Sequence, residues 1–594
     1  MQDSIGVNFE IGFKMYSVLK NVQILVSSLK AHGVRNVVHC PGGADMPIGI
    51  SLDNDDFFNC YSVVDERSAV YFAIGISMAN GNSPVAVLCT SGTAVSNFHS
   101  GMEEAFYKGV PVIAITADRS PYLLDQFEIQ KIDQRKIFAG CSKHEVDLPI
   151  VNNGDEAAYC DRLVNTALLE MSDGIPGPIH INVPTVGKAR CVATSLPNVK
   201  VIKRIRLGED EKELHLAHET LKNASRILVV VGENSGLTDA DKRAMEEFHD
   251  KYGAVYSVEH MSNYKGAGSV ISYRVTEAMA SSAFDQFMPD LVIDFGGHIA
   301  TVKLKAFLRE RAGKFIHWSI QPDGRVRDGF KTLTNIFVCK PGEFFSYFNS
   351  MEPSNCLKSG ADYYNAWKDA VSQIDPPIQG LSNFRVASSL AQWIPQNSYL
   401  ELGILNSIRV MQFFDLDPSI TVSANIGGLG IDGCLSTAVG KAAAVEEKVF
   451  IMQGDLSFFY DMNALNIRYV KSNLRVLLVN NGGAAEFHIG GGRKVHPDID
   501  NYLAAKHGAS ARGWAEECGF KYLGVSDVDD LEDAMKIFTA ESNAPILLEI
   551  FTDRDFDAEM LDTFYSDNSG ASSSEKARSA AKFAAKRLIS MVQK

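Results

Sequence analysis

The stretch KVFIMQGDLSFFYDMNALNIRYVKSNLRVLLVNNGG (448–483) carries the clearest fold signal in this chain. It contains two apolar runs, KVFIMQ and LRVLLV, which have the length and composition of buried strands. Each run ends in a polar turn: Gly454-Asp455 follows the first, and Asn481 to Gly483 follow the second. This pattern is typical of neighbouring strands in the parallel sheet of an α/β domain.

The same rhythm of helical stretches and short β-branched runs extends over most of the chain. It recurs in VRNVVHC, PVAVLCT and GPIHINVP, then in RILVVVGENSG and DLVIDFGGHIA, and again around the opening stretch. We therefore predict the α/β class, with three consecutive parallel-sheet domains and linkers near 185–205 and 345–375, where Pro, Ser, Asn and charge replace periodic apolar residues. The expected boundaries are 1–190, 200–350 and 375–560, followed by a helical tail at 561–594.

Composition excludes several classes of protein. The chain has 594 residues, of which 46% are hydrophobic and 22% are charged, as in ordinary globular proteins. Its net charge of −15 would repel a polyanion, so a nucleic-acid binder is not expected. No apolar run reaches the roughly 18–20 residues that span a bilayer, and no signal peptide is recognisable, so we expect a cytoplasmic protein with no membrane partner. The ten cysteines form no C-x-x-C pair, so neither a zinc site nor a disulfide framework is indicated.

The polar turns of the opening stretch suggest a metal site. Asp455 and Asn481 stand 26 positions apart at the ends of two expected strands, and they offer hard oxygen ligands for Mg²⁺, with a backbone carbonyl beside them. Such an ion would hold a phosphate group. The alternative is that both segments are ordinary turns of an α/β sheet.

With this spacing, the stretch resembles the diphosphate-binding signature of the thiamine diphosphate-dependent enzymes. The resemblance implies that Asp455, the Asn481 side chain and the Gly483 carbonyl ligate Mg²⁺, and that Ser457 lies near the diphosphate. It also implies a pyrimidine-binding domain, a central domain and a diphosphate-binding domain, in agreement with the three domains expected from the strand pattern.

The first domain holds a candidate for the glutamate that this family uses. In YSVVDERSAVYFAIGISMANG (61–81), Glu66 follows an expected strand and begins an apolar helix. A carboxyl at that place would hydrogen-bond the aminopyrimidine, whose amino and imino tautomers relay the proton from thiazolium C2. The alternative is a solvated helix start.

Within the family, the chain resembles the menaquinone-pathway synthases of 2-succinyl-5-enolpyruvyl-6-hydroxy-3-cyclohexene-1-carboxylate (SEPHCHC). The likeness covers about 20–555 and rests on CPGGADMP, VDER, TSGTAVSN, TADRSP, GPIHINVP, GLGIDGCLSTAVG and GDLSFFYDMNAL. It implies that Ile431 bends the cofactor into its V shape, although core packing is the alternative. The site residues that we expect are Glu66, Glu486, Gln130 and Arg119 for catalysis, and Pro41, Ser407, Gly430, Ile431, Gly454, Asp455, Leu456, Ser457 and Asn481 for the cofactor.

Departures from the family pattern fall where carboxylate-binding arginines are expected. Ala44, His298, Met411 and Ile426 stand at those places, and Asp45 adds a negative charge near the expected pocket mouth. Arg119, Gln130 and Ser407 remain, whereas Arg409, two positions from the lost site, is expected to point elsewhere. Losing such guanidinium forks would weaken binding of a polyanionic acceptor such as isochorismate.

The segment after Asn481 also departs from the family pattern. Glu486 stands near the place of thiazolium C2, and we expect its apolar neighbours to hold it partly protonated for proton transfer. His488, Arg493, Lys494 and His496 follow on a Gly-rich loop, whose alternative interpretation is a polar surface loop. Its GGGR run lacks the strand-to-helix context of a nucleotide motif.

Together these features predict an enzyme that uses thiamine diphosphate and Mg²⁺. It would decarboxylate a 2-oxo acid to an enamine, which is then protonated or ligated to an acceptor. An authentic SEPHCHC synthase, which joins 2-oxoglutarate to isochorismate, is one alternative. A nucleotide- or flavin-binding oxidoreductase is another, although no G-x-G-x-x-G follows a strand. A third alternative is a catalytically silent homologue. The presence of Glu66, Asp455 and Asn481 argues against it. The resemblance implies a homodimer or homotetramer in which Glu66 and the diphosphate site of one active centre come from different chains.

Overall fold

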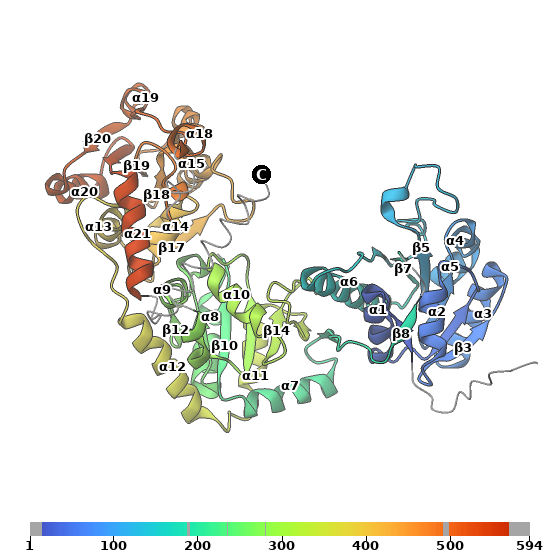
Figure 1. Ribbon diagram of the computed structural model, residues 1–594. Helices are drawn as coiled ribbons and strands as arrows, with labels where there is room; N and C mark the ends of the chain where they lie inside the picture. Colours follow the sequence, from blue (N-terminus) through green and yellow to red (C-terminus); the bar gives the residue numbers. More distant parts are fainter. Residues whose placement is uncertain (1–14, 187–189, 235, 280, 491–497, 569–594) are drawn as a thin grey trace, which may run out of the picture. The chain divides into compact units, whose positions relative to one another are not determined.

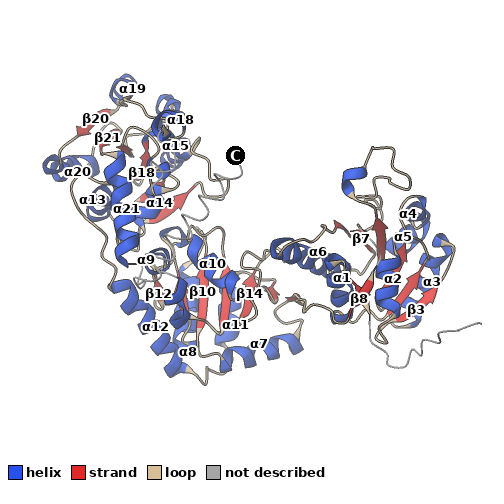
Figure 2. Cartoon of the chain, in the orientation of Figure 1, coloured by secondary structure: helices blue, strands red, loops and turns tan. Residues whose placement is uncertain are grey.

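The computed structural model describes residues 15–186, 190–234, 236–279, 281–490 and 498–568. The chain forms two compact units: the first ends at Ile205 and also takes in Gly324–Ile336, and the second holds the remainder. Strands and helices alternate in both units (Figure 2), as the sequence predicts for the α/β class.

The first unit is built on a parallel six-stranded sheet with the strand order β3-β2-β4-β5-β7-β6. Its central strands β4 and β5 are buried throughout, because helices lie on both faces of the sheet. The strands are β2 (Asn36–His39), β3 (Asn59–Ser62), β4 (Val85–Cys89), β5 (Val112–Asp118), β6 (His144–Asp147) and β7 (Ile179–Pro184), with the short β1 (Tyr16–Ser17), β8 (Cys191–Ala193) and β9 (Lys203–Ile205). The helices are α1 (Lys20–Ala31), α2 (Met46–Asp53), α3 (Glu66–Ala79), α4 (Thr93–Asn97), α5 (His99–Lys108), η1 (Pro121–Leu123) and α6 (Gly154–Ser172).

The second unit begins with a parallel sheet whose strands follow the order β12-β11-β10-β13-β14. The linker expected at 345–375 is wrong in part, because α12 occupies Leu357–Ser372 and buries Tyr363 and Trp367. The strands are β10 (Ile227–Val231), β11 (Val255–Ser257), β12 (Ser269–Val270), β13 (Leu291–Phe295) and β14 (Ile316–Ile320), and β15 spans Asn335–Phe337. The helices are α7 (Glu211–Asn223), α8 (Asp239–Tyr252), η2 (His260–Ser262), α9 (Tyr273–Ala278), η3 (Ser281–Phe287), α10 (Val302–Glu310), α11 (Pro341–Asn349) and α12.

A further six-stranded parallel sheet, also in the second unit, has the order β17-β16-β18-β19-β21-β20. Counted within each sheet, this order repeats that of the first unit. The strands are β16 (Tyr399–Leu402), β17 (Thr421–Ala424), β18 (Val449–Gly454), β19 (Leu474–Asn480), β20 (Lys521–Val525) and β21 (Ile546–Phe551). The helices are α13 (Asn383–Trp393), α14 (Asn406–Met411), α15 (Cys434–Ala444), α16 (Asp455–Tyr460), η4 (Met462–Asn466), η5 (Ala485–Phe487), α18 (Ile499–Tyr502), α19 (Arg512–Glu517), η6 (Val528–Asp530), α20 (Leu531–Thr539) and α21 (Arg554–Asn568).

The strand register brings the two polar turns of the opening stretch together. Strand β18 pairs with β19 so that Gly454 lies opposite Val479, and both strands end at the same edge of the sheet. Helix α21 packs beside α13, where Phe564 contacts Phe384 (Figure 1). Helix α21 runs to Asn568, and the rest of the expected C-terminal tail, 569–594, lies outside the described residues.

Candidate active site

A cavity of about 300 Å³ lies at the carboxyl edge of the sheet that contains β18 and β19. This edge is where α/β sheets place their ligands, because loops and helix N-termini diverge there. The cavity collects most of the cofactor and metal residues expected in this part of the sequence. Its lining includes Ser407, Ile431, Gly454, Asp455, Leu456, Ser457, Asn481, Gly483 and Glu486, together with Asn383, Ile404, Leu405, Asn406, Val479, Ala484, Ala485 and Phe487.

Asp455 is the buried acid of this cavity, with 3% of its surface exposed. Its Oδ2 accepts hydrogen bonds from the main-chain N–H groups of Asn481 (3.1 Å) and Gly483 (2.9 Å), and its Oδ1 accepts one from Leu456 (2.7 Å). Burial raises the pKa of Asp455 above its ordinary value, although the Gly483 N–H and the nearby His507 oppose this. A bound cation would offset the cost of burying this carboxylate.

The turn after β19 is shaped by residues that contact it from α21. The Asn481 amide donates to Asp557 (3.1 Å), which directs its NH₂ group to that acid and its oxygen away from it. Gly483 has a φ of +144°, and a Cβ there would lie 2.5 Å from the Ala504 carbonyl oxygen, so glycine is required. Carboxylate, amide and carbonyl oxygens suit Mg²⁺, so the chemistry of this donor set fits the expected ion.

Sequence reasoning missed several residues that support this turn. Arg554 donates to the Gly482 carbonyl (2.8 Å), and His507 Nε2 lies 3.2 Å from Asp455 Oδ2. Asp557 also accepts from the Asn383 N–H (2.7 Å), and burial raises the pKa of Asp557 to about 6. The signal that could have found Arg554 and Asp557 is the charged cluster TDRDFD directly after β21, a strand whose end lies beside that of β19.

Ile431 and Ser407 also line the cavity. Ser457 donates to the Ile431 carbonyl (2.9 Å), which ties the loop before α15 to the start of α16. Leu405 precedes α14 with a φ of +62°, a strained conformation for a non-glycine residue of the kind that gathers at functional sites. Gly430 adjoins Ile431 but is not itself part of the lining.

Glu486 lines the cavity, but its surroundings differ from the prediction. The expectation that apolar neighbours hold its carboxyl partly protonated is wrong, because Arg409 binds it with contacts of 2.7 and 3.3 Å. Burial alone would lower the pKa of Arg409, whereas the hydrogen bonds and charge of Glu486 raise it above its ordinary value. Glu486 and Arg409 thus form an ion pair at the edge of the cavity.

The structure places two of the residues that stand where arginines were expected. Met411 and Ile426 are buried in the hydrophobic core, and neither belongs to the lining of the described cavity. Arg409, expected to point elsewhere, is the residue of α14 that reaches the cavity rim through Glu486. His298 is exposed at the end of β13.

The expected residues of the first unit gather at the carboxyl edge of its own sheet. Glu66 is the first residue of α3 and accepts a hydrogen bond from the Asn97 amide (3.3 Å), and Pro41 follows β2. Gln130 donates to the Ser91 carbonyl (3.4 Å), while Arg119 pairs with Glu128 (2.9 Å).

Asp45 does not present the negative charge that was expected near the pocket mouth. Its side chain is fully buried, and its Oδ2 lies 3.0 Å from His39 Nε2. The neighbouring Ala44 packs against the core of the first unit.

The Gly-rich loop after Glu486 is described in part. His488 is buried, with Nδ1 2.7 Å from Asp555 and Nε2 3.0 Å from Asp500, so it is not on a polar surface. Arg493, Lys494 and His496 lie outside the described residues.

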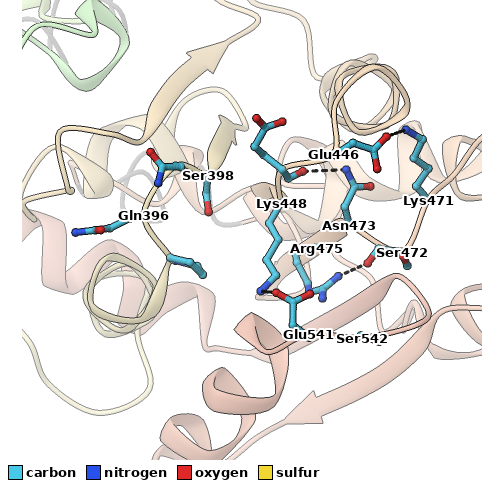
Figure 3. Close-up of a pocket in the computed structure, with 13 residues that line it drawn as sticks. Gln396, Ser398, Glu446, Lys448, Lys471, Ser472, Asn473, Arg475, Glu541 and Ser542 are labelled. Atoms are coloured by element: carbon cyan, nitrogen blue, oxygen red, sulfur yellow. Dashed lines mark hydrogen bonds and ion pairs between the residues drawn. The ribbon is translucent and has the colours of Figure 1, made fainter.

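A second cavity, of about 350 Å³, opens at the opposite edge of the same sheet (Figure 3). Lys448 there reaches Glu541 (2.7 Å), and Lys471 reaches Glu446 (3.0 Å). Arg475 donates its side-chain hydrogen bonds to main-chain carbonyl groups, such as that of Ser472. Since these cations are already bound, the second cavity is the weaker candidate for a ligand.

Among the described residues, one group of side chains that could ligate a metal lies in the first unit. His99, Glu103 and Cys141 have ligand atoms within 4.8 Å of one another. His99 Nε2 lies 3.5 Å from Glu103 Oε1, one turn further along α5, and burial raises the pKa of the Cys141 thiol to about 11. Because side chains four residues apart on a helix meet without an ion, this group carries no metal assignment.

Comparison with known proteins agrees with this geometry. Residues 19–137 match the thiamine pyrophosphate enzyme family, N-terminal TPP binding domain. The chain is 37% identical over 558 residues to the SEPHCHC synthase of Bacteroides fragilis, with 93% of this chain and 99% of that protein covered. It is also 37% identical to the synthase of Bacteroides thetaiotaomicron (93% and 99% covered) and 30% identical to that of Flavobacterium johnsoniae (91% and 97% covered). In the described part of the chain, every helix is too short or too polar to cross a membrane. The chain belongs to the thiamine pyrophosphate-dependent enzymes, in the group that contains the SEPHCHC synthases.

Proposed function

We propose that the protein decarboxylates a 2-oxo acid with thiamine diphosphate and Mg²⁺, and that the product takes up a proton or adds to a second substrate. The observation that carries this proposal is the convergence of Asp455, Asn481 and Gly483 on one cavity that Ile431 also lines. When bound, the cofactor supplies the electron sink for the charge left by loss of CO₂.

Each expected residue then has a role that its surroundings support. Asp455, the Asn481 amide oxygen and the Gly483 carbonyl hold Mg²⁺, and Ser457 lies where the diphosphate would bind. Glu66 holds a proton at the aminopyrimidine, and the Asn97 amide orients its carboxylate. Arg119, Gln130 and Pro41 belong to the same edge as Glu66, where they contact substrate or pyrimidine.

We propose a homodimer, or a dimer of dimers, in which the partner's first unit completes the cavity. Exposed apolar side chains on α3 and just before it support this, since Val64 is 82% exposed and Tyr71, Phe72 and Met78 are about half exposed. Exposed apolar patches of this kind mark protein interfaces.

The test is a screen of 2-oxo acids for CO₂ release, with and without aldehyde or enone acceptors. The purified protein is loaded with cofactor and Mg²⁺, and a sample stripped with EDTA serves as the control. We expect release from at least one acid and its loss on stripping. No release from any acid, despite bound cofactor, would refute the proposal.

A second candidate is SEPHCHC synthesis itself, which the names of the relatives favour. Incubation with 2-oxoglutarate and isochorismate separates the two candidates. We expect no detectable addition product, because Ala44 lacks a cationic group and Arg409 is already bound by Glu486. Efficient product formation would establish the second candidate instead.

A further inference from the structure

We propose that Glu486 is a built-in carboxylate that occupies Arg409 and thereby selects substrates with a single carboxylate over dicarboxylates. The inference rests on the proposed function, because it names the substrate class of that same cavity. The pair of side chains concerned, Arg409 and Glu486, lies at the cavity rim.

The geometry of the pair is that of a carboxylate bound by a guanidinium fork. Arg409 Nη1 lies 2.7 Å from Glu486 Oε2, and Nη2 lies 3.3 Å from Oε1. The Asn406 side-chain oxygen accepts a further bond from Nη1 (2.6 Å), which fixes the guanidinium. Bidentate pairs of this kind are the strong, oriented form of carboxylate recognition.

The described residues that line the cavity offer no cation to a substrate carboxylate, since their charged groups are Asp455 and Glu486, and both are acids. Nearby Arg554 binds the Gly482 carbonyl and lies 3.0 Å from Asp500. Arg119, which we place at the substrate on the first-unit edge, pairs with Glu128 (2.9 Å). Within the second unit, Arg409 is the guanidinium that a second carboxylate would reach by displacing Glu486.

A dicarboxylate would have to displace Glu486 from Arg409. The exchange replaces one carboxylate by another on the same guanidinium, so little is gained, and the displaced Glu486 stays beside the new anion. The substrate carboxylate and the Glu486 carboxylate would then lie side by side, and like charges that are partly shielded from water repel each other. A 2-oxo acid with a neutral side chain avoids this exchange, because its one carboxylate is the group lost as CO₂.

The test measures binding of glutarate, a dicarboxylate that cannot be decarboxylated by this chemistry, to the cofactor-loaded protein by isothermal titration calorimetry. Glu486→Gln is expected to bind glutarate at least about 10-fold more tightly than the native protein, because a charge-assisted fork becomes available. The double variant Arg409→Gln/Glu486→Gln is expected to return to the native affinity. The matched control is Glu516→Gln, which frees Arg512 from an exposed Arg–Glu pair and should leave glutarate binding unchanged.

A second measurement follows CO₂ release from 2-oxoglutarate and from 2-oxobutyrate. We expect Glu486→Gln to shift the ratio of kcat/KM values toward 2-oxoglutarate by about 10-fold. Glutarate affinity in Glu486→Gln no higher than in the native protein, with melting temperature and cofactor binding preserved, would overturn the inference. Absence of CO₂ release from all acids in every variant would refute the proposed function instead, while the glutarate titration would still decide the role of Glu486.

Discussion

The sheet of the first unit and the sheet that contains β18 and β19 have the same strand order but different groups at their carboxyl edges. In the first, Glu66 begins the helix after β3, is only partly buried and accepts one hydrogen bond, from Asn97. In the other, Asp455 begins the helix after β18, is buried and accepts three main-chain N–H bonds.

On the proposed function, this difference suits the two acids to two kinds of chemistry. Many donors and deep burial fix the Asp455 carboxylate in place, as the proposed metal ligand requires. A single neutral donor leaves the Glu66 carboxyl open to the aminopyrimidine nitrogen that would gain and lose a proton. Substitution of Glu66 should therefore affect the reaction rate, whereas substitution of Asp455 should affect cofactor affinity.

Substitution of Glu66 is expected to have the largest effect, on rate alone. Glu66→Gln keeps the shape of the side chain but loses its proton affinity, so exchange of the cofactor C2 proton should slow by about 100- to 1,000-fold. Cofactor affinity should stay within a few-fold. Quenched-flow NMR measures the exchange, and Asp65→Asn, which keeps the helix cap of α3, is the matched control. Native exchange rates in Glu66→Gln would remove this residue from the mechanism.

Substitution of Asp455 is expected to act on affinity instead. Asp455→Ala deletes a metal ligand, so Mg²⁺-dependent binding of thiamine diphosphate should weaken by at least about 100-fold. Calorimetric titration at fixed Mg²⁺ measures this, and the exposed Asp529→Ala serves as control. Cofactor retention in Asp455→Ala that EDTA does not disturb would place the metal elsewhere.

The smallest expected effect is the pH dependence of stability that one buried group contributes in each unit. Burial lowers the pKa of His260 in the second unit to about 3, so its contribution to stability is full above pH 6.5 and is lost on acidification. Burial raises the pKa of Asp161 in the first unit to about 6, so its contribution is largest below pH 3.8 and is lost as the pH rises through 6.

Between pH 6.5 and 4.5 the contribution of His260 should therefore fall by about 2 kcal/mol, while that of Asp161 should rise by about 2 kcal/mol. In the second unit, Asp557 and Glu259, whose pKa values burial raises to about 6 and about 7, act against His260, so each contribution is measured as a difference between variant and native protein. Hydrogen exchange of each unit, corrected for the intrinsic pH dependence, measures these differences in His260→Gln and Asp161→Asn. A pH response that either substitution leaves unchanged would contradict the corresponding assignment.

The sequence was sufficient for features that depend on local pattern. Strand ends at Gly454 and Asn480 follow from apolar runs broken by polar turns, and Asp455, Asn481 and Gly483 follow from the residues in those turns. Contacts between distant segments were out of reach, because nothing near Glu486 in the sequence indicates Arg409, 77 positions away. Burial was equally hidden: Asp45 and His488 look like surface groups until the fold encloses them.

The most direct test of the account mixes the two inactive variants, Glu66→Gln and Asp455→Ala, and lets their subunits exchange. If the two acids of one active centre come from different chains, each hybrid dimer has one intact centre, and random exchange should restore about a quarter of native activity. Native mass spectrometry verifies that hybrids have formed. Hybrids with no restored activity would contradict the claim that the edge bearing Glu66 and the edge bearing Asp455 act together across a dimer.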